Sequence, residues 1–169
     1  MNRPLPGEYA TFHATYVDKI GDGDILDILA EQQDSTYHLF KSLPQEKAGY
    51  AYAEGKWTLR EVLGHMIDTE RIMTYRALRF ARGDSKELPG FDQDVYIKNG
   101  RFNDFEISAL AEEFMLLRKV NLLFFKSLNK EERQRGGIAS GYAVTVNALL
   151  YIIAGHEKHH VGVVNERYL

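Results

Sequence analysis

Residues 148–164 read ALLYIIAGHEKHHVGVV, and this apolar stretch holds three of the six histidines of the chain. His156 and His160 are four positions apart, so on a helix they lie on one face with Cβ atoms roughly 5–6 Å apart. Two imidazoles at that spacing can bind one metal ion. We therefore interpret the stretch as part of a core helix that carries a candidate metal site.

The apolar residues around these histidines recur at intervals of three and four, which indicates one buried helical face. His156 and His160 fall within that repeat, whereas His159 lies about 60° to its side and is the weaker candidate. Two buried imidazoles repel each other when charged and need donors when neutral, and a bound cation removes both difficulties. A structural polar cluster and a His156/His159 pair are the alternatives. The repeat comprises Leu149, Ile153, His156, His160, Val163 and Arg167.

The composition excludes several classes of function. The chain has 169 residues, of which 44% are hydrophobic, so it can bury a core and fits one domain. Its 21 basic and 24 acidic residues give a net charge of −3, which is neither a nucleic-acid footprint nor a polybasic membrane patch. There is no cysteine, so disulfides, thiolate–zinc sites and cysteine nucleophiles are excluded. A bound metal must use histidine, carboxylate or water.

The sequence also indicates where the protein works. The first eight residues lack the apolar core of a signal peptide. No stretch approaches the roughly 18 consecutive apolar residues that a membrane helix needs. We therefore expect a cytoplasmic protein that has no membrane partner and binds no nucleic acid.

Apolar periodicity and start signals predict four long helices. Asp24 has the N-cap chemistry for a helix that runs to about Ser42. Thr58 and Glu61 form a capping box for a second helix, which meets no breaker before Gly83. The other two predicted helices are residues 105–128 and a last one from Tyr142 or Thr145 to about Arg167.

The segments between these helices complete the predicted architecture. Residues 9–20 are expected to form a short helix or an extended strap over the bundle. The connection over residues 83–104 is longer than most helix–helix turns and has the length at which loops are often functional. A short helical turn from Asp92 to Lys98 is expected within it. Because no alternating strand is convincing, the sequence predicts an all-α four-helix bundle with a long crossover between helices two and three.

A third histidine, His65, belongs to the predicted second helix and shares its core-facing side with Thr69 and Arg76. A single histidine there would usually be hydrogen-bonded within the core. Helical bundles often build metal sites from side chains on facing helices, so together with His156 and His160 we favour a metal ligand. The remaining histidines considered, His13 and His38, are interpreted as partly buried or surface residues.

The run from His156 to His160 also matches the HExxH pattern of zinc metallopeptidases, in which the glutamate is the general base. Those enzymes usually take a third ligand well downstream, and nine residues follow His160 here. They also carry a substrate-binding sheet, for which the sequence offers no strands. Glu157 would point about 100° away from His156 on a helix. These observations argue against the peptidase interpretation, although Glu157 stays a residue to test by mutation.

Three motifs together resemble the DinB superfamily, close to its YfiT-like branch. They are residues 55–71 (GKWTLREVLGHMIDTER), residues 88–96 (LPGFDQDVY) and residues 155–160 (GHEKHH). The resemblance covers nearly the whole chain and implies one four-helix-bundle domain over residues 1–169. It also implies a divalent ion, nickel or zinc, held by His65, His156 and His160 with water at the remaining positions.

Some members of this family resemble transferases or isomerases that use bacillithiol, mycothiol or glutathione. The resemblance thus implies a metal-dependent enzyme, either a low-molecular-weight-thiol S-transferase or a hydrolase, acting on a small molecule. The alternative is a non-catalytic, metal-stabilised bundle that serves in dimerisation or stress response. A homodimer would use an apolar face left free by the bundle. Candidates for contacts around the metal or the substrate are Asp68, Glu70, Asp94 and Tyr96.

Overall fold

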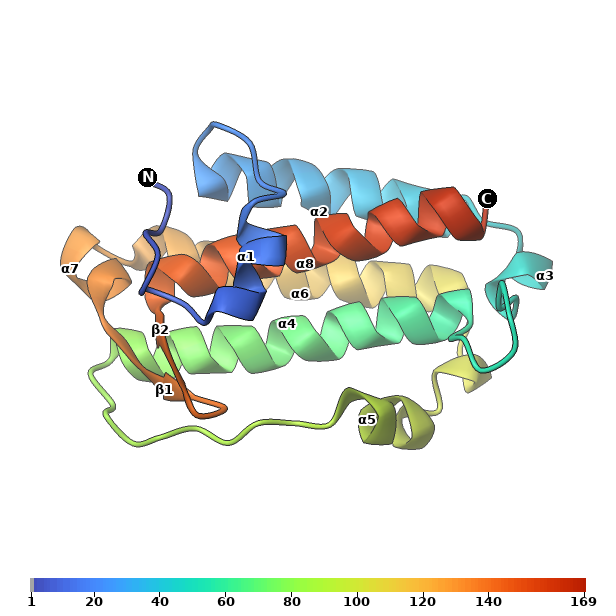
Figure 1. The fold of residues 1–169 in the computed structure, drawn as a ribbon. Helices are drawn as coiled ribbons and strands as arrows, with labels where there is room; N and C mark the ends of the chain where they lie inside the picture. The colour runs from blue at the N-terminus through green and yellow to red at the C-terminus, as the bar shows by residue number, and fades with distance from the viewer. Residues whose placement is uncertain (1) are drawn as a thin grey trace.

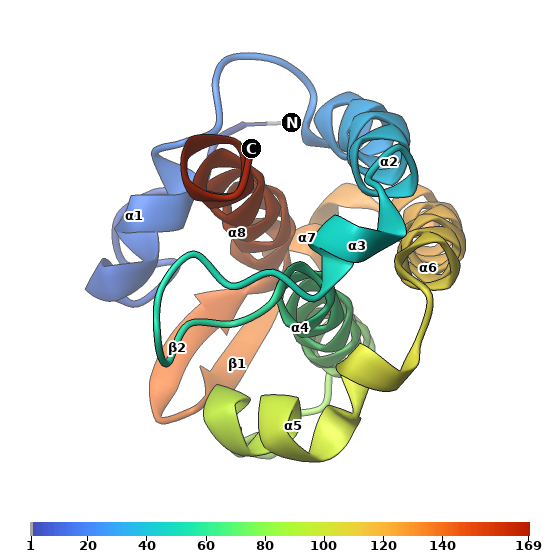
Figure 2. The same cartoon turned by 90° about the vertical axis from the view of Figure 1, so that its right-hand side faces the viewer.

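The computed structural model describes residues 2–169, and its frame consists of four long helices (Figure 1). The end-on view shows them around a common axis, α2 beside α6 and α8, and α4 beside α6 and α8 (Figure 2). The predicted all-α four-helix bundle is therefore confirmed, with a long crossover between its second and third helices. The four helices are α2 (Ile25–Lys41), α4 (Leu59–Ala81), α6 (Ile107–Ser127) and α8 (Val146–Arg167).

Side-chain caps set the starts of three of these helices, as N-cap chemistry requires. The Asp24 carboxylate accepts a hydrogen bond from the Leu26 N–H at the start of α2. Both halves of the predicted capping box between Thr58 and Glu61 are present at the start of α4. The Thr145 side chain accepts from the Ala148 N–H and begins α8.

Short elements close the ends and sides of the bundle. The predicted short helix near the N-terminus is present as two consecutive turns, and α1 packs against α8. This contact is close because Gly155 faces it: a Cβ built on Gly155 would overlap the carbonyl oxygen of Tyr16. The short elements are η1 (Thr11–His13), α1 (Ala14–Val17), α3 (Gln45–Ala48), α5 (Gln93–Gly100), η2 (Phe102–Asp104) and α7 (Lys130–Gln134).

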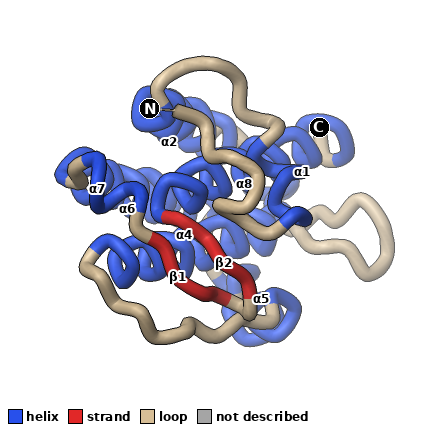
Figure 3. The backbone as a smooth tube through the Cα atoms, turned by 60° about the vertical axis from the view of Figure 1, so that its left-hand side comes forward, coloured by secondary structure: helices blue, strands red, loops and turns tan. Residues whose placement is uncertain are grey.

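The expectation that the chain has no strand was wrong at one place. Strands β1 (Gly136–Ala139) and β2 (Tyr142–Thr145) form an antiparallel hairpin before α8 (Figure 3). Four-residue strands are too short to show alternation, but their turn has a clear signature. Ser140 and Gly141 both have positive φ, 54° and 80°, as a two-residue type I′ turn demands.

The hairpin also fastens the long crossover to the bundle. The Leu88 N–H donates to the Ile138 carbonyl oxygen at 2.9 Å, and the Ser140 N–H donates to the Leu88 carbonyl oxygen at 2.9 Å. Leu88 is buried. The predicted helical turn within the crossover is present as α5, with Asp92 as its N-cap.

Polar side chains divide the buried core into two apolar halves. One half includes Leu29, Phe80 and Leu149, and the other includes Phe40 and Phe114, together with further residues of all four long helices. Along each long helix, buried polar residues come between the members of these halves. We call this middle level the polar layer; it comprises Thr36, His65, Thr69, Glu70, Arg118, Asn121, His156 and Glu157. Within residues 2–169, no helix is long and apolar enough to span a bilayer.

Candidate metal centre

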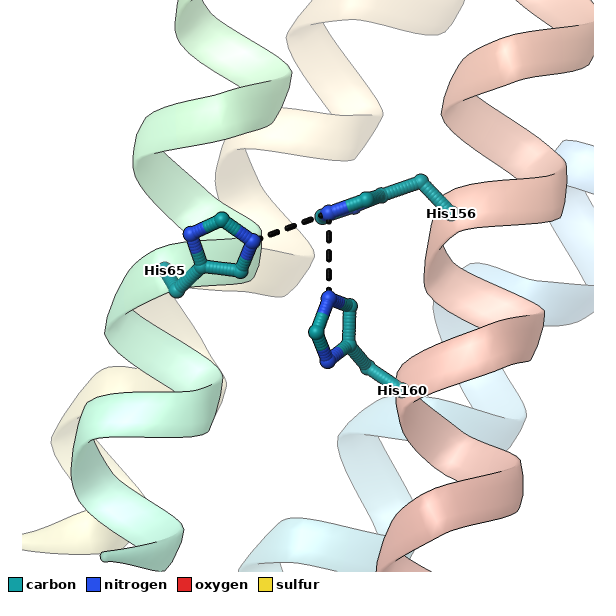
Figure 4. A group of neighbouring side chains, drawn as sticks. All are labelled: His65, His156 and His160. Carbon is teal, nitrogen blue, oxygen red and sulfur yellow. Dashed lines mark hydrogen bonds between the residues drawn. The ribbon is translucent and has the colours of Figure 1, made fainter. Parts of the chain in front are cut away.

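Three histidines of the polar layer and its edge converge from two helices (Figure 4). His65 projects from α4, and His156 and His160 project from α8 one turn apart. The Nε2 atoms of His65 and His156 are 2.9 Å apart, and those of His160 and His156 are 3.1 Å apart. One ligand nitrogen from each residue lies within 4.8 Å of the other two. The structure therefore brings together the three residues that the sequence nominated, and we call them the histidine cluster.

Hydrogen bonding alone cannot account for the histidine cluster. A ring nitrogen carries either one proton or one lone pair, and His156 Nε2 faces two other Nε2 atoms at once. No choice of tautomers gives both contacts a well-formed hydrogen bond. Three nitrogens about 2 Å from one tetrahedral ion lie roughly 3.3 Å apart, close to the spacing seen here. The donor set thus fits a divalent cation.

Burial keeps these imidazoles neutral, the form in which they bind metal. Desolvation lowers the pKa of His65 to about 4 and that of His160 to about 3. The pKa of His156 is lowered well below its usual value, first by burial and then by its histidine neighbours. Removing a charged imidazole from water is unfavourable, so the lone pairs stay available near neutral pH.

Aromatic rings enclose the histidine cluster. The Trp57 ring lies 4.8 Å from His65 and 6.5 Å from His160 between ring centroids. The Tyr16 ring meets His156 edge-on at 5.4 Å. His159 packs beside Tyr16 and is not part of the cluster, so the alternative His156/His159 pair does not match the arrangement.

A buried ion network occupies the polar layer behind the histidine cluster. Arg118 donates from Nε and Nη2 to both carboxylate oxygens of Glu70, each at 2.8 Å, and from Nη2 to Glu157 Oε2 at 2.6 Å. Asn121 donates to Glu70 at 3.0 Å, and the Thr36 hydroxyl donates to Glu157 Oε1 at 2.5 Å. Two carboxylates face one guanidinium, so the network carries a net negative charge when both are ionised.

This network shows what Glu157 does in place of a peptidase base. Its carboxylate is directed to Thr36 and Arg118, away from the histidine cluster, in agreement with the sequence evidence against the peptidase interpretation. Arg118 is not among the residues nominated from the sequence, although a signal for it is present. Arg118 follows Phe114 by four positions and precedes Asn121 by three, which places two polar residues on the buried face of α6.

Two cavities border the histidine cluster, and different histidines line each of them. One, of about 280 Å³, is lined by His65 and His156, and we call it the α4 cavity. The other, of about 330 Å³, is lined by His160 together with His159 and Asp94. The crossover contributes to both, through Phe91 and Gln93 in the α4 cavity and Asp94 in the second.

The other residues nominated from the sequence have separate positions. Glu70 belongs to the ion network, and Asp94 lines the second cavity. Asp68 forms an ion pair with Arg71 that is partly exposed. Tyr96 is exposed beside Phe91, with 5.4 Å between their ring centroids.

Comparison with known proteins identifies the family of this chain and a similar curated protein. Residues 28–164 match the family model of the DinB superfamily. A curated protein of Oceanobacillus iheyensis, named as a candidate metal-dependent hydrolase, is 27% identical over 150 residues, which is 85% of each chain.

Solved structures share the fold at low sequence identity. YfiT from Bacillus subtilis, described as a probable metal-dependent hydrolase with an unusual four-helix bundle topology, matches with a TM-score of 0.75 and 17% identity, over 98% of this chain and 92% of its own. A mycothiol-dependent maleylpyruvate isomerase matches with a TM-score of 0.67 and 11% identity, over 90% of this chain and 62% of its own. A DinB-like protein of Bacillus subtilis, YjoA, has a TM-score of 0.59 and 19% identity, over 85% and 87%.

Proposed function

The chain belongs to the DinB superfamily, and from this premise we propose that it is a metal-dependent enzyme whose divalent ion is held by His65, His156 and His160. The observation that carries the proposal is the convergence of three neutral imidazoles, of which His65 and His156 line one cavity and His160 lines another. Three protein ligands leave positions open, which is the catalytic and not the structural pattern. The name of the Oceanobacillus iheyensis relative supports a metal-dependent reaction.

The residues of the chain prepare the site in three ways. A divalent ion bound by three neutral imidazoles keeps its double charge and lowers the pKa of a thiol or water beside it. The Trp57 ring packs beside His65 and the Tyr16 ring beside His156, which limits the orientations of these two imidazole rings. When both of its carboxylates are ionised, the ion network of Glu70, Arg118 and Glu157 carries a net negative charge behind the ligands, which favours a cation there.

We propose transfer to a low-molecular-weight thiol of the bacillithiol type as the reaction. The chain has no cysteine, so the thiol comes from a cosubstrate. Two cavities that reach the same histidine cluster suit two reactants, a thiol and a small electrophile, held on different sides of one centre. Their volumes, about 280 and 330 Å³, favour small molecules over a polymer.

Hydrolysis is the second candidate, with water in place of the thiol as nucleophile. The name of the curated relative favours it, because that name refers to metal-dependent hydrolysis. The two candidates use the same ligands and the same cavities, and they differ only in whether a thiol appears in the product. A non-catalytic, metal-stabilised module would show neither product.

The metal site is tested first by elemental analysis. Protein prepared without a polyhistidine tag or chelator should contain about one zinc or nickel ion per chain. His160→Ala should lose stoichiometric binding, whereas His159→Ala, its neighbour outside the cluster, should keep it. A tag-free protein that stays metal-free under saturating zinc and nickel would refute the metal site.

The reaction is tested by incubating the metal-loaded protein and a small electrophile with and without a low-molecular-weight thiol. Mass spectrometry separates an S-conjugate, expected from the transferase, from a hydrolysis product that forms without thiol. The His160→Ala variant is the matched negative control. If neither product forms with a broad set of electrophiles while chelation still lowers the melting temperature, the non-catalytic module is the correct function.

A further inference from the structure

Arg76 is a buried cation with no acidic partner. It lies on α4 three turns beyond His65, lines the α4 cavity, and is 5% exposed. Its Nη2 donates to the Pro89 carbonyl oxygen at 2.9 Å and to Ser140 Oγ at 2.8 Å. Among residues 2–169, no aspartate or glutamate forms an ion pair with Arg76.

The contrast with Arg118 shows how unusual this is. Arg118 is also buried, and two carboxylates neutralise it. Burying a guanidinium away from water is unfavourable unless charge and hydrogen bonds compensate. Desolvation lowers the pKa of Arg76, and three of its five N–H groups, one on Nε and two on Nη1, have no oxygen acceptor among the described residues. Arg76 therefore has free donors and an uncompensated charge at the wall of the α4 cavity, where an anion from outside the chain would be stabilised.

Two further polar atoms of the α4 cavity also lack partners. Thr69 Oγ1 is buried without a hydrogen bond, on α4 between His65 and Arg76. His13 Nδ1 is buried without a hydrogen bond on the facing N-terminal segment. Buried polar atoms in folded proteins nearly always have partners, so these two atoms at the cavity wall are free to hydrogen-bond a water or a ligand.

The remaining wall of the α4 cavity defines the rest of the ligand. Phe12, Phe91, Tyr142 and Leu149 provide an apolar and aromatic surface. At about 280 Å³ the cavity lies just below the usual range for drug-sized ligands. A fitting molecule is small, has one anionic end and has an apolar body.

We propose that the α4 cavity binds a small organic acid whose carboxylate pairs with Arg76 beside Thr69 and His13, and whose other end faces His65 and His156. Only the statement that the ligand reacts at the end that faces His65 and His156 rests on the proposed function. The anion site itself does not, because Arg76, Thr69 and His13 are independent of the metal. Arg76 also connects the crossover and the hairpin to α4, so the test must separate ligand binding from folding.

The experiment is isothermal titration calorimetry, which measures the dissociation constants of phenylacetate and of its neutral amide, phenylacetamide, for the tag-free protein. Both titrations are done on chelated and on zinc-loaded protein. Phenylacetate should bind in both states and phenylacetamide at least tenfold more weakly. A titration with inorganic phosphate shows whether the site prefers a carboxylate; a phosphate that binds more tightly than phenylacetate would overturn the assignment to an organic acid.

Variants locate the binding. Arg76→Lys, which keeps the charge, should weaken phenylacetate about tenfold, and Arg76→Gln should abolish binding. Thr69→Val, which keeps the shape of the side chain, should weaken binding while the melting temperature stays near that of the parent, so the test holds even if Arg76→Gln does not fold. Arg82→Gln, in an exposed ion pair at the C-cap of the same helix, is the control and should leave binding unchanged.

The outcomes separate the two proposals. Binding of phenylacetate by the chelated protein, lost in the Arg76 variants, supports the anion site even if no metal is found. Equal binding of acid and amide, or equal effects of Arg76→Lys and Arg82→Gln, would refute the site. Metal content and S-conjugate formation are read out separately, so their failure refutes the proposed function alone.

Discussion

Arg118 Nη2 lies 2.6 Å from Glu157 Oε2, and this ion pair holds the residue after His156 away from the histidine cluster. The glutamate of the HExxH pattern is thereby a member of a buried ion network. The same guanidinium also binds both oxygens of Glu70. One fully buried arginine thus connects α4, α6 and α8 at the level where the bundle changes from one apolar half to the other.

Removing the guanidinium should destabilise the protein strongly. Arg118→Leu leaves the carboxylates of Glu70 and Glu157 buried without their cation, which is expected to lower the free energy of unfolding by about 3–5 kcal/mol. Urea denaturation followed by circular dichroism measures this. Arg82→Gln, which breaks an exposed ion pair with Glu132, should change it by roughly 1 kcal/mol or less. Similar losses in both variants would show that the network does not stabilise the polar layer.

Close packing at Gly155 should be intolerant of a single methyl group. Gly155→Ala forces α1 away from α8, because the new Cβ would overlap the Tyr16 carbonyl oxygen, and we expect a loss of about 1–3 kcal/mol. Gly162→Ala on the same helix is the matched control, since no atom lies within 4 Å of a Cβ placed there. That control should be neutral or stabilise by up to about 1 kcal/mol through helix propensity. Thermal or urea unfolding of the two variants tests the difference, and equal stabilities would contradict it.

The stability of the metal-free protein should depend on pH through His65. Its pKa falls on folding from 6.5 to about 4 because burial disfavours the charged ring. Between these values the unfolded chain takes up a proton that the folded protein does not. The free energy of unfolding therefore decreases as the pH falls from 6.5 toward 4, by up to about 1.4 kcal/mol per pH unit for this histidine.

Urea denaturation in the presence of a chelator measures that slope. His65→Gln should reduce the slope of the unfolding free energy against pH. The variant lacks the imidazole that takes up a proton in the unfolded chain but not in the folded protein. His38→Gln, at an exposed position of α2, is the control and should leave the slope unchanged. A slope that is the same in the parent and in His65→Gln would exclude this histidine as the cause.

Metal should stabilise the fold by mass action, because the folded protein presents the three imidazoles together. Free zinc at one hundred times its dissociation constant should raise the free energy of unfolding by about 2.7 kcal/mol. Differential scanning calorimetry with and without chelator measures the shift in melting temperature. His160→Ala should show no such shift, whereas His159→Ala should behave as the parent does. A zinc-dependent shift of equal size in His160→Ala would place the ion elsewhere.

The four long helices could be predicted from the sequence because the signals for them are local. The caps at Asp24 and Thr58 need only residues within one turn, and the spacing of His156 and His160 needs only one helix. The hairpin was missed because its strands are four residues long, although its Ser140–Gly141 turn was visible.

The rest of the site depends on contacts distant in sequence. Arg118 binds Glu70 and Glu157, which are 48 and 39 residues away in the sequence, so no local sequence pattern predicts the ion network. Arg76 was placed on the same face as His65, but its lack of an acidic partner is a property of the folded molecule. The closeness of Gly155 to Tyr16 likewise follows only from the position of the N-terminal segment across α8.

The histidine cluster and the walls of the α4 cavity have different structural origins. The three histidines stand on two long helices, whereas Phe12, Phe91 and Tyr142 come from η1, the crossover and the hairpin. Substitutions in these short segments should therefore change the shape of the α4 cavity without disturbing the histidine cluster. If the proposed activity is found, the chain is accordingly a scaffold for directed evolution, in which a combinatorial library at the three aromatic positions varies the accepted molecule while the histidine cluster is kept.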